Sequence, residues 1–443
     1  MESLFLWFIT LLIALIIIVP YYMKFRKTQK EMAARKLEAE KLGINKPRAQ
    51  YPFIDVSKCI GCGSCVTACP EGDVLGVVYG KAVLINGLRC VGHGHCEKAC
   101  PVGALKVGLG DITTRDDIPI LDEHYQSSVP GLYVVGELGG LSLIRNAIQQ
   151  GRDAVEHIAT TLEPNVHETI KDVIIVGAGP AGLSAALAAV KHNMSYMVLD
   201  QQDPGGTILQ YPRRKLVMTQ PVEIPLYGKL TETEYTKEEL LEIWNDIIKK
   251  FNLEITTGHK LEHVEKANGI FRVITNQGDY YSRRVVLALG RRGTPRKLNV
   301  PGENLPKVSY QLIDAQGYNN DHVLVVGGGD SAVEAAIGLA RQKGNVVTIS
   351  YRKSKFFRIK KKNEDRINQL IKKGKINPIF NSQVVEIKVH SVRLKTDTEI
   401  IEIPNDYVFV LIGGIPPFDM LKKMGIRFGG EMKPLVEPEV VHS

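Results

Sequence analysis

The sequence predicts an α/β protein with two parallel-sheet domains of the dinucleotide-binding type, after a small α+β domain and one apolar helix. Three observations predict this order: two glycine-rich runs each follow an apolar strand, all seven cysteines lie between Cys59 and Cys100, and residues 4–20 carry no charge. A chain of 443 residues suits two to four domains. The expected division is 1–22 for the apolar helix, 23–50 for a basic segment, 51–110 for the cysteine domain, 111–290 plus 405–443 for the first dinucleotide domain and 291–404 for the second.

The apolar helix is predicted to cross a membrane once. Leu4–Pro20 is uncharged, and seventeen helical residues extend about 26 Å, close to the ~30 Å hydrocarbon core of a bilayer. A cleaved signal peptide is the alternative, but only three residues precede the apolar run. Because the basic residues follow the helix, the positive-inside rule places the N-terminus outside and the catalytic domains in the cytoplasm.

The net charge is concentrated in the segment after this helix. Between Lys24 and Arg48 there are nine Lys or Arg and three Glu, a local +6 out of a formal +8. The rest of the chain is nearly balanced, which argues against nucleic-acid binding, since that needs a basic face on a folded domain. Residues 24–42 are expected to form a helix that meets anionic headgroups or that serves as a solvated spacer.

The seven cysteines form two runs of one pattern. The first is C-x2-C-x2-C-x3-C-P over Cys59–Pro70, and the second, Cys90–Pro101, has histidine at the second ligand position. A zinc ribbon does not need four ligands in eleven residues followed by Pro, and a disulfide framework suits a small secreted chain. The pattern is that of the bacterial-type dicluster ferredoxins, in which the fourth cysteine of each run ligates the other 4Fe–4S cluster. The predicted ligands are Cys59, Cys62, Cys65 and Cys100 for one cluster, and Cys69, Cys90, Cys96 and the candidate His93 for the other.

His93 leaves the type of the second cluster open. It is either a nitrogen ligand of a 4Fe–4S cluster, since imidazole does ligate iron–sulfur centres, or a neighbour of a 3Fe–4S cluster. His95 or water could also take the ligand position. Replacing a thiolate by a neutral imidazole removes a negative charge, so we expect this cluster to be the easier one to reduce.

The first glycine run has the full context of a dinucleotide site. An apolar strand leads into Gly177 and then into an Ala-rich helix. The glycines permit the tight turn and the approach of a pyrophosphate to the helix N-terminus. The next apolar run ends in Asp200, where a carboxylate would bind a ribose hydroxyl. The predicted binding residues are Gly177, Gly179, Pro180, Ala181, Gly182, Asp200 and Gln201.

The second glycine run differs at the end of its following strand. There the sequence continues as Tyr351-Arg352-Lys353, with Arg358 further on, in place of an acid. Positive charge at that corner accommodates a 2′-phosphate, so this site is expected to prefer NADP over NAD. A solvated basic loop is the alternative. The predicted binding residues are Gly327, Gly329, Asp330, Ser331, Ala332, Arg352, Lys353 and Arg358.

Together these motifs resemble the thioredoxin reductase-like flavoproteins, over roughly 111–443. The resemblance rests on GxGPAG at 177–182, Gly-Gly-Thr at 205–207, the Leu-Ala-Leu-Gly run ending at Gly290, and GGGDSA at 327–332. It implies FAD at the first site and NADPH at the second. It also implies that Gly205, Gly206 and Thr207 lie beside the isoalloxazine and that Gly290 belongs to the cofactor-binding set.

Two departures from that family matter. The redox C-x-x-C of thioredoxin reductases is absent from 308–317, and Ala181 stands where related low-molecular-weight disulfide reductases place a cysteine. Disulfide reduction is therefore disfavoured. The family also ends in a flavin-covering segment, and here its counterpart, with Gly136 and Glu137, precedes the first glycine run. We therefore expect a circular permutation of the FAD domain, with the usual C-terminal piece at 112–161.

A chain with an NADP site, an FAD site and two clusters is expected to convert two-electron into one-electron transfer, because flavin can do both. The predicted function is electron transfer between NADP(H), FAD and the clusters, and on to or from a redox partner protein or membrane acceptor, with no catalytic acid, base or nucleophile required. The sequence leaves open the direction of electron flow and whether the protein forms a homodimer. One alternative is a reductase that acts on a small molecule or quinone at the flavin, and rapid NADPH oxidation by a chain lacking 51–110 would favour it. The other is a non-catalytic, membrane-anchored redox sensor, which would show negligible turnover with every electron acceptor.

Overall fold

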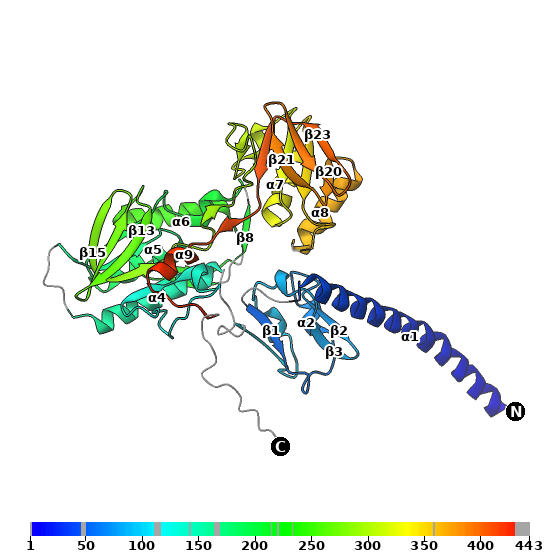
Figure 1. Ribbon diagram of the computed structural model, residues 1–443. Coiled ribbons are helices and arrows are strands. Elements are labelled where there is room, and N and C mark those ends of the chain that lie inside the picture. Colours follow the sequence, from blue (N-terminus) through cyan, green and yellow to red (C-terminus); the bar gives the residue numbers. More distant parts are fainter. Residues whose placement is uncertain are drawn as a thin grey trace, which may run out of the picture. The chain divides into compact units, whose positions relative to one another are not determined.

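The protein is described from a computed structural model, in which two compact units are distinguished (Figure 1). The first unit comprises residues 1–110 and 357–365, and the second comprises 111–356 and 366–443. The residues that the structure describes are 2–45, 50–109, 117–140, 143–163, 169–213, 215–218, 221–232, 234–357 and 359–429.

The first unit contains the cysteine-rich domain, which is α+β as predicted. Its strands pair antiparallel, β1 (Gln50–Ile54) with β4 (Leu105–Leu109) and β2 (Leu75–Val78) with β3 (Lys81–Leu84). Two one-turn helices, α2 (Ser64–Thr67) and α3 (His95–Lys98), each follow a glycine in the left-handed region. This repetition mirrors the two cysteine runs. Buried cysteines and small aliphatic side chains form the core between the strands and these helices.

Helix α1 (Glu2–Leu42) runs for 41 residues through the boundary expected at 22. Its C-terminal part packs on the β2–β3 hairpin, where Gln29 Oε1 accepts a hydrogen bond from the Tyr79 backbone N–H at 2.7 Å. Arg35 pairs with Asp73 at 2.7 Å, just before β2. In the described part of the chain, no helix is both long and apolar enough to cross a bilayer. The transmembrane anchor expected at 1–22 therefore gains no support from the structure.

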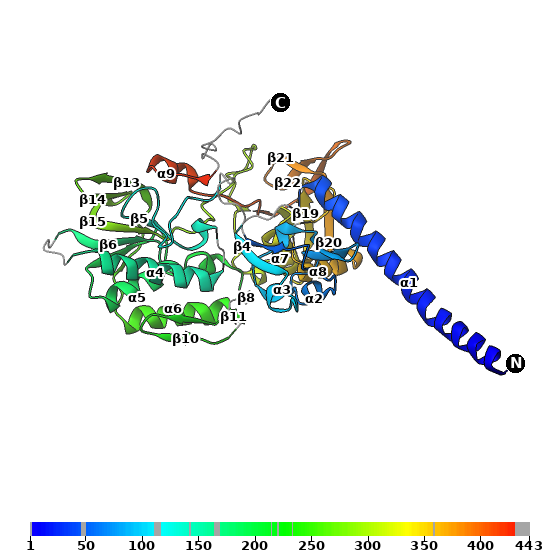
Figure 2. The same ribbon diagram turned by 90° about the horizontal axis from the view of Figure 1, so that it is seen from below.

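The second unit contains a seven-stranded sheet that carries the first glycine run. Alternate residues of its strand β6 (Lys171–Val176) face opposite sides, so that Val173 and Ile175 enter one core and Ile174 and Val176 the other. Helices α4 (Ile144–Thr161) and α5 (Pro180–Lys191) lie side by side on the first face (Figure 2), and α9 (Phe418–Lys423) covers the second. The parallel strands are β12 (Ile255–Thr256), β7 (Tyr196–Leu199), β6 (Lys171–Val176), β15 (Gly278–Leu287) and β5 (Leu132–Val134), and β14 (Ile270–Thr275) and β13 (Leu261–Ala267) continue the sheet antiparallel.

The described parts of the segment expected to be permuted, 112–161, include one strand of this sheet and a helix that packs on α5. Strand β5 pairs parallel with β15. Helix α4 approaches α5 so closely that a Cβ added at Gly151 would lie 2.0 Å from the Ala181 carbonyl oxygen. Pro119 forms an isolated antiparallel bridge with Phe428. Residues 112–116, 141 and 142 lie outside the described residues.

A second parallel sheet carries the other glycine run. It is formed by β17 (Val308–Ser309), β24 (Tyr407–Val410), β18 (His322–Val326), β19 (Val346–Tyr351) and β20 (Ile376–Phe380). Helix α7 (Asp330–Ala340) follows β18, and α8 (Lys361–Lys372) precedes β20. An antiparallel sheet of β21 (Gln383–Ile387), β22 (Ser391–Lys395) and β23 (Ile400–Pro404) follows.

The structure places β24 in this second sheet, whereas the sequence analysis assigned everything after 404 to the first dinucleotide domain. The three apolar residues 408–410 fit the interior of either parallel sheet, so their pattern alone does not choose. The chain returns to the first sheet only beyond β25 (Gly414–Ile415), which pairs with β16 (Thr294–Pro295). Phe428 then enters the core of the first sheet.

Four short strands and one α-helix of the described chain lie between β7 and β12 in the sequence. The short strands β8 (Leu216–Met218) and β11 (Glu234–Thr236) pair with each other, as do β9 (Val222–Ile224) and β10 (Gly228–Leu230). Helix α6 (Lys237–Lys250) begins with a capping box, in which Thr236 and Glu239 each bond the other's backbone N–H. It packs Trp244 into the core under the first face of the sheet.

Candidate functional site

The first glycine loop has the close backbone contacts that only glycine permits. Gly177 has φ +111°, and a Cβ there would lie 2.4 Å from the Ala288 carbonyl oxygen. A Cβ at Gly182 would lie 1.7 Å from the Gly177 carbonyl oxygen. Helix α5 begins at Pro180, with Gly179 as its N-cap. The first backbone N–H groups of α5 are therefore free of side chains at the point where a dinucleotide pyrophosphate would approach.

Asp200 lies beside this loop at the end of β7. Its Oδ2 accepts a hydrogen bond from the Ala178 backbone N–H at 2.6 Å, and its Oδ1 accepts one from the Gln202 N–H at 2.8 Å. Burial raises the pKa of Asp200, and these backbone hydrogen bonds oppose that effect. The predicted neighbour Gln201 is exposed in the following turn. The carboxylate therefore lies beside the glycine loop at the end of the second strand, where a ribose-binding acid is expected.

The predicted flavin-side residues come together at the same edge of the sheet. The Gly205 N–H donates to the Ala178 carbonyl oxygen at 2.9 Å. A Cβ at Gly206 would lie 3.0 Å from the Gly179 Cα, and one at Gly290 would lie 3.9 Å from Thr207 Oγ1. Residues far apart in the sequence thus form one glycine-lined cradle, which fits a flat cofactor that must approach the backbone closely.

Glu137 stands in the turn after β5, at the N-terminal side of α4. Burial raises the pKa of Glu137, while the nearby Arg291 acts to lower it. The Gly136 N–H donates to the Oε1 of buried Gln150 at 2.8 Å, which fixes this turn to α4. Sequence reasoning missed Gln150 and Arg291. Arg291 directly follows Gly290 and could have been noticed, whereas Gln150 is recognisable only from the fold.

The second glycine loop repeats the geometry of the first. Gly327 has φ +142°, and a Cβ there would lie 2.4 Å from the Leu411 carbonyl oxygen. Gly329 is the N-cap of α7, and a Cβ added to it meets nothing within 4 Å. The predicted residues Asp330, Ser331 and Ala332 form the first turn of α7.

The basic corner of the second site follows β19 directly. Arg352 and Lys353 are both exposed there. The end of β19 lies beside the glycine loop, because the Gly327 N–H donates to the carbonyl oxygen of Ser350 in β19 at 3.0 Å. The two cations therefore lie at the carboxyl edge of the sheet beside the glycine loop, where a 2′-phosphate would be bound. Arg358, the third predicted cation, lies outside the described residues.

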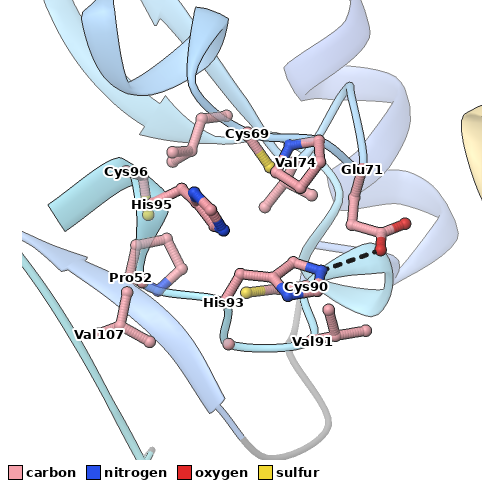
Figure 3. Close-up of a pocket in the computed structure, with 14 residues that line it drawn as sticks. Pro52, Cys69, Glu71, Val74, Cys90, Val91, His93, His95, Cys96 and Val107 are labelled. Atoms are coloured by element: carbon pink, nitrogen blue, oxygen red, sulfur yellow. Dashed lines mark hydrogen bonds and ion pairs between the residues drawn. The ribbon is translucent and has the colours of Figure 1, made fainter. Parts of the chain in front are cut away.

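The seven cysteines line two separate cavities, in the grouping that the two runs predict. One cavity is lined by Cys59, Cys62, Cys65 and Cys100. The other is lined by Cys69, Cys90, Cys96, His93 and His95 (Figure 3). Each cavity thus takes one cysteine from the other run. In the described part of the chain, no group of three His, Cys, Asp or Glu is placed to hold a single metal ion.

The thiols of these cavities are largely shielded from water. Burial raises the pKa of Cys65, Cys69 and Cys90, and it raises that of Cys96 to about 11. Cys62 differs, since it is exposed and its hydrogen bond with Ser64 lowers its pKa. Thiolates are the ligands of iron, so positive metal charge would favour them in these cavities. Four thiol donors around one cavity and three beside two imidazoles around the other suit iron–sulfur clusters.

A buried carboxylate that the sequence analysis missed borders the second cavity. Glu71 Oε1 is 3.2 Å from His93 Nε2 and 3.5 Å from Lys360 Nζ. Burial acts to raise the pKa of Glu71, but the hydrogen bond with His93 and the charge of Lys360 outweigh it and leave the pKa lowered. Its place directly after Cys69-Pro70 was visible in the sequence, but its contacts were not.

The comparisons with known proteins agree with a cysteine-rich domain followed by two dinucleotide-binding domains. Residues 51–101 match the 4Fe–4S dicluster domain family, and residues 174–443 match the pyridine nucleotide-disulphide oxidoreductase family. The chain is 28% identical over 264 residues to bacilliredoxin reductase Bdr of Bacillus subtilis, covering 58% of this chain and 81% of that one. It is also 28% identical over 272 residues to the ferredoxin–NADP reductase of Ignicoccus hospitalis, covering 59% and 83%.

Among solved structures, the bacillithiol disulfide reductase Bdr (YpdA) from Staphylococcus aureus is similar, with a TM-score of 0.53 and 28% identity over 58% of this chain and 81% of that one. The two-dinucleotide fold with a ferredoxin-like 4Fe–4S domain is therefore confirmed, and the chain is an FAD-dependent NAD(P)H oxidoreductase equipped for NADPH-linked electron transfer. With a family match over more than half of its length, the chain belongs to the pyridine nucleotide-disulphide oxidoreductase family.

Proposed function

We propose that this protein passes electrons between NADP(H), FAD and two iron–sulfur clusters, and from there to or from a redox partner. One observation carries the proposal: every cysteine of the chain lines one of two cavities in the ferredoxin-like domain, while both glycine loops are complete. No thiol is left for the dithiol chemistry that the names of several relatives imply for those proteins. The clusters replace the disulfide as the electron carrier.

The chain's own residues would act by binding and orienting the cofactors. FAD, when bound, accepts two electrons as hydride and gives them up singly. The first glycine loop, with Gly177 and Gly182, would hold the pyrophosphate of FAD. Asp200 would bind its ribose, and Glu137 would lie near the flavin end. Arg352 and Lys353 would hold the 2′-phosphate of NADP, with Gly327 and Gly329 against its pyrophosphate. The pairing of β5 with β15 supports the view that 112–161 is the permuted end of the FAD domain.

The two cavities support one cluster each. Cys59, Cys62, Cys65 and Cys100 would hold a 4Fe–4S cluster. Cys69, Cys90 and Cys96 would hold a second cluster, of the 4Fe–4S type if a histidine completes it and of the 3Fe–4S type if none does.

We place the exchange with the redox partner at the first cluster. Cys62 is exposed, and so are Ile60 and Val102 of the same cavity wall, at 63% and 40%. In the second cavity Cys96 is buried and Cys69 and Cys90 are half-buried, so none of its thiols is exposed as Cys62 is. Small apolar surfaces around an exposed redox centre suit the short-lived complexes of electron-transfer proteins. The ferredoxin–NADP reductase name of one relative fits a small redox protein as that partner.

We further propose that the N-terminal part of α1 holds the protein at a bilayer, with the dinucleotide domains in the cytoplasm. Trp7, Ile16 and Ile18 are 76%, 64% and 61% exposed, and the basic segment from Lys24 follows them. The test is flotation of the full chain with vesicles that contain anionic lipid, followed by protease protection in cells. A chain that stays at the bottom of the gradient without detergent would overturn this proposal.

The electron path is tested by anaerobic titration of the purified protein with NADPH, followed by visible absorbance and low-temperature EPR. Flavin bleaching together with signals of reduced clusters is expected. Flavin bleaching with silent clusters, while dithionite still reduces them, would refute the path and favour a reductase that acts at the flavin. The EPR spectrum of the oxidised protein separates a 3Fe–4S from a 4Fe–4S second cluster.

A further inference from the structure

We propose that Glu71 is a positioning residue that holds His93 as the fourth ligand of the second iron–sulfur cluster, and that Lys360 holds Glu71 in place. The inference rests on the two-cluster arrangement under the proposed function and goes beyond it by choosing the ligand, the ligating atom and its support. It also predicts a 4Fe–4S rather than a 3Fe–4S cluster at this site.

The choice of ligand follows from how the two histidines sit around the cavity. In Figure 3 both rings border the cavity with Cys69, Cys90 and Cys96, and His93 turns one nitrogen towards Glu71. The side chain of His93 is 12% exposed, whereas His95 is an exposed residue at the start of α3. A ligand held in one orientation by a buried partner loses less side-chain freedom on binding iron than an exposed one.

The ligating atom follows from the hydrogen bond. The Nε2 of His93 lies 3.2 Å from Glu71 Oε1, and a carboxylate accepts but does not donate. Nε2 therefore carries the hydrogen, which leaves the lone pair on Nδ1 for a metal. Histidines that bind metals commonly donate their other N–H to a carboxylate, which fixes the ring and makes it a stronger donor. Glu71 and His93 have this relationship.

Lys360 completes the arrangement from another part of the same unit. Its Nζ lies 3.5 Å from Glu71 Oε1, and the Glu71 side chain is only 6% exposed. The segment 357–365 that carries Lys360 is held by the Asn86 side chain, which donates to the Phe357 carbonyl oxygen at 3.1 Å, and by an ion pair of Arg89 with Glu364 at 2.9 Å. A buried carboxylate is costly unless it is paired and hydrogen-bonded, and Lys360 and His93 supply both contacts.

The charges predict opposite effects for two substitutions. Glu71→Gln removes a negative charge beside the second cluster and weakens the donor strength of His93, so the cluster becomes easier to reduce. We expect about a tenfold rise in its reduced-to-oxidised ratio at a fixed potential, which is about 59 mV for one electron. Lys360→Met removes a positive charge and shifts the ratio the other way. The exposed Glu31 and Lys362 give matched controls, Glu31→Gln and Lys362→Met.

The experiment uses the full iron-loaded chain, poised with dithionite rather than NADPH, so that failure of the NADPH–FAD path leaves it unaffected. Pulsed EPR of the reduced protein should detect nitrogen coupling at one cluster. That coupling should disappear in His93→Ala, persist in His95→Ala, and leave the other cluster's signal unchanged. Redox titration followed by EPR should show the opposite shifts of Glu71→Gln and Lys360→Met, with Glu71→Asp close to the unchanged protein.

Three results would overturn the proposal: no nitrogen coupling in the unchanged protein, loss of the coupling in His95→Ala instead, or equal potentials in Glu71→Gln, Lys360→Met and their controls. If Glu71→Gln does not fold, the nitrogen coupling of the unchanged chain and the shift of the cluster's reduction potential in Lys360→Met decide whether the proposal holds. If only one cluster assembles in the unchanged chain, the proposed two-cluster function fails first, and that outcome is read from the iron content alone.

Discussion

Two glycines of the first loop are predicted to respond in opposite ways to the same substitution. Gly182→Ala would place a Cβ 1.7 Å from the Gly177 carbonyl oxygen, so α5 and β6 must separate by more than 1 Å. Overpacking costs about 1–3 kcal/mol, and the clash with backbone puts this change at the upper end, about 3 kcal/mol. At 2–4 °C per kcal/mol, the Tm of the second unit should fall by roughly 6–12 °C.

Gly179→Ala should spare stability and reduce FAD binding instead. A Cβ at Gly179 would lie 3.7 Å from the Gly206 Cα, an ordinary contact, and φ is −80°. The added methyl nevertheless occupies the space through which the pyrophosphate approaches the backbone. We expect FAD affinity to fall tenfold or more, which is about 1.4 kcal/mol.

The assay compares thermal unfolding of the FAD-free proteins, since bound cofactor stabilises by mass action, and then titrates FAD by fluorescence. Gly329→Ala is the matched control, because a Cβ there meets nothing within 4 Å and should weaken NADPH binding alone. The reasoning is refuted if Gly182→Ala unfolds at the same temperature as the unchanged protein. It is equally refuted if Gly179→Ala destabilises the FAD-free protein as much as Gly182→Ala does.

Three further outcomes are expected. Cys62→Ala should remove the EPR signal of the first cluster and leave that of the second, because Cys62 lines only one of the two cavities. Thr236→Ala should cost about 1 kcal/mol of stability with unchanged cluster potentials, since it removes only the cap that Thr236 shares with Glu239. Burial lowers the pKa of His157, and the charge of the stacked His124 lowers it further. As the pH falls below the unfolded value of about 6.5, the unfolded chain takes up a proton more readily than the folded one, so the protein should lose stability. NMR should find a higher pKa for His157 in His124→Gln than in the unchanged protein.

The sequence predicted best where chemistry and conformation are set by neighbours in the chain. Both glycine loops, the acid Asp200 and the basic pair after β19 follow from local patterns, because a turn at positive φ and a strand end are local features. The grouping of the cysteines was also predictable, since the two runs repeat one fold. The boundary at 404 was not, because the short apolar strand β24 satisfies either sheet and only its pairing with β18 decides.

The residues that sequence reasoning missed share one physical property: each acts through a partner distant in the chain. Gln150 matters because α4 brings its amide to the Gly136 N–H, and Arg291 because β15 ends beside Glu137. Glu71 is the clearest case, since a glutamate after a cysteine run is ordinary until Lys360 and His93 are both seen in contact with its Oε1. A polar residue without a local pattern becomes a candidate only when burial shows that its charge must be paired. Burial is a property of the fold, which explains why the grouping of the cysteines around two cavities could be predicted while the contacts of Glu71 could not.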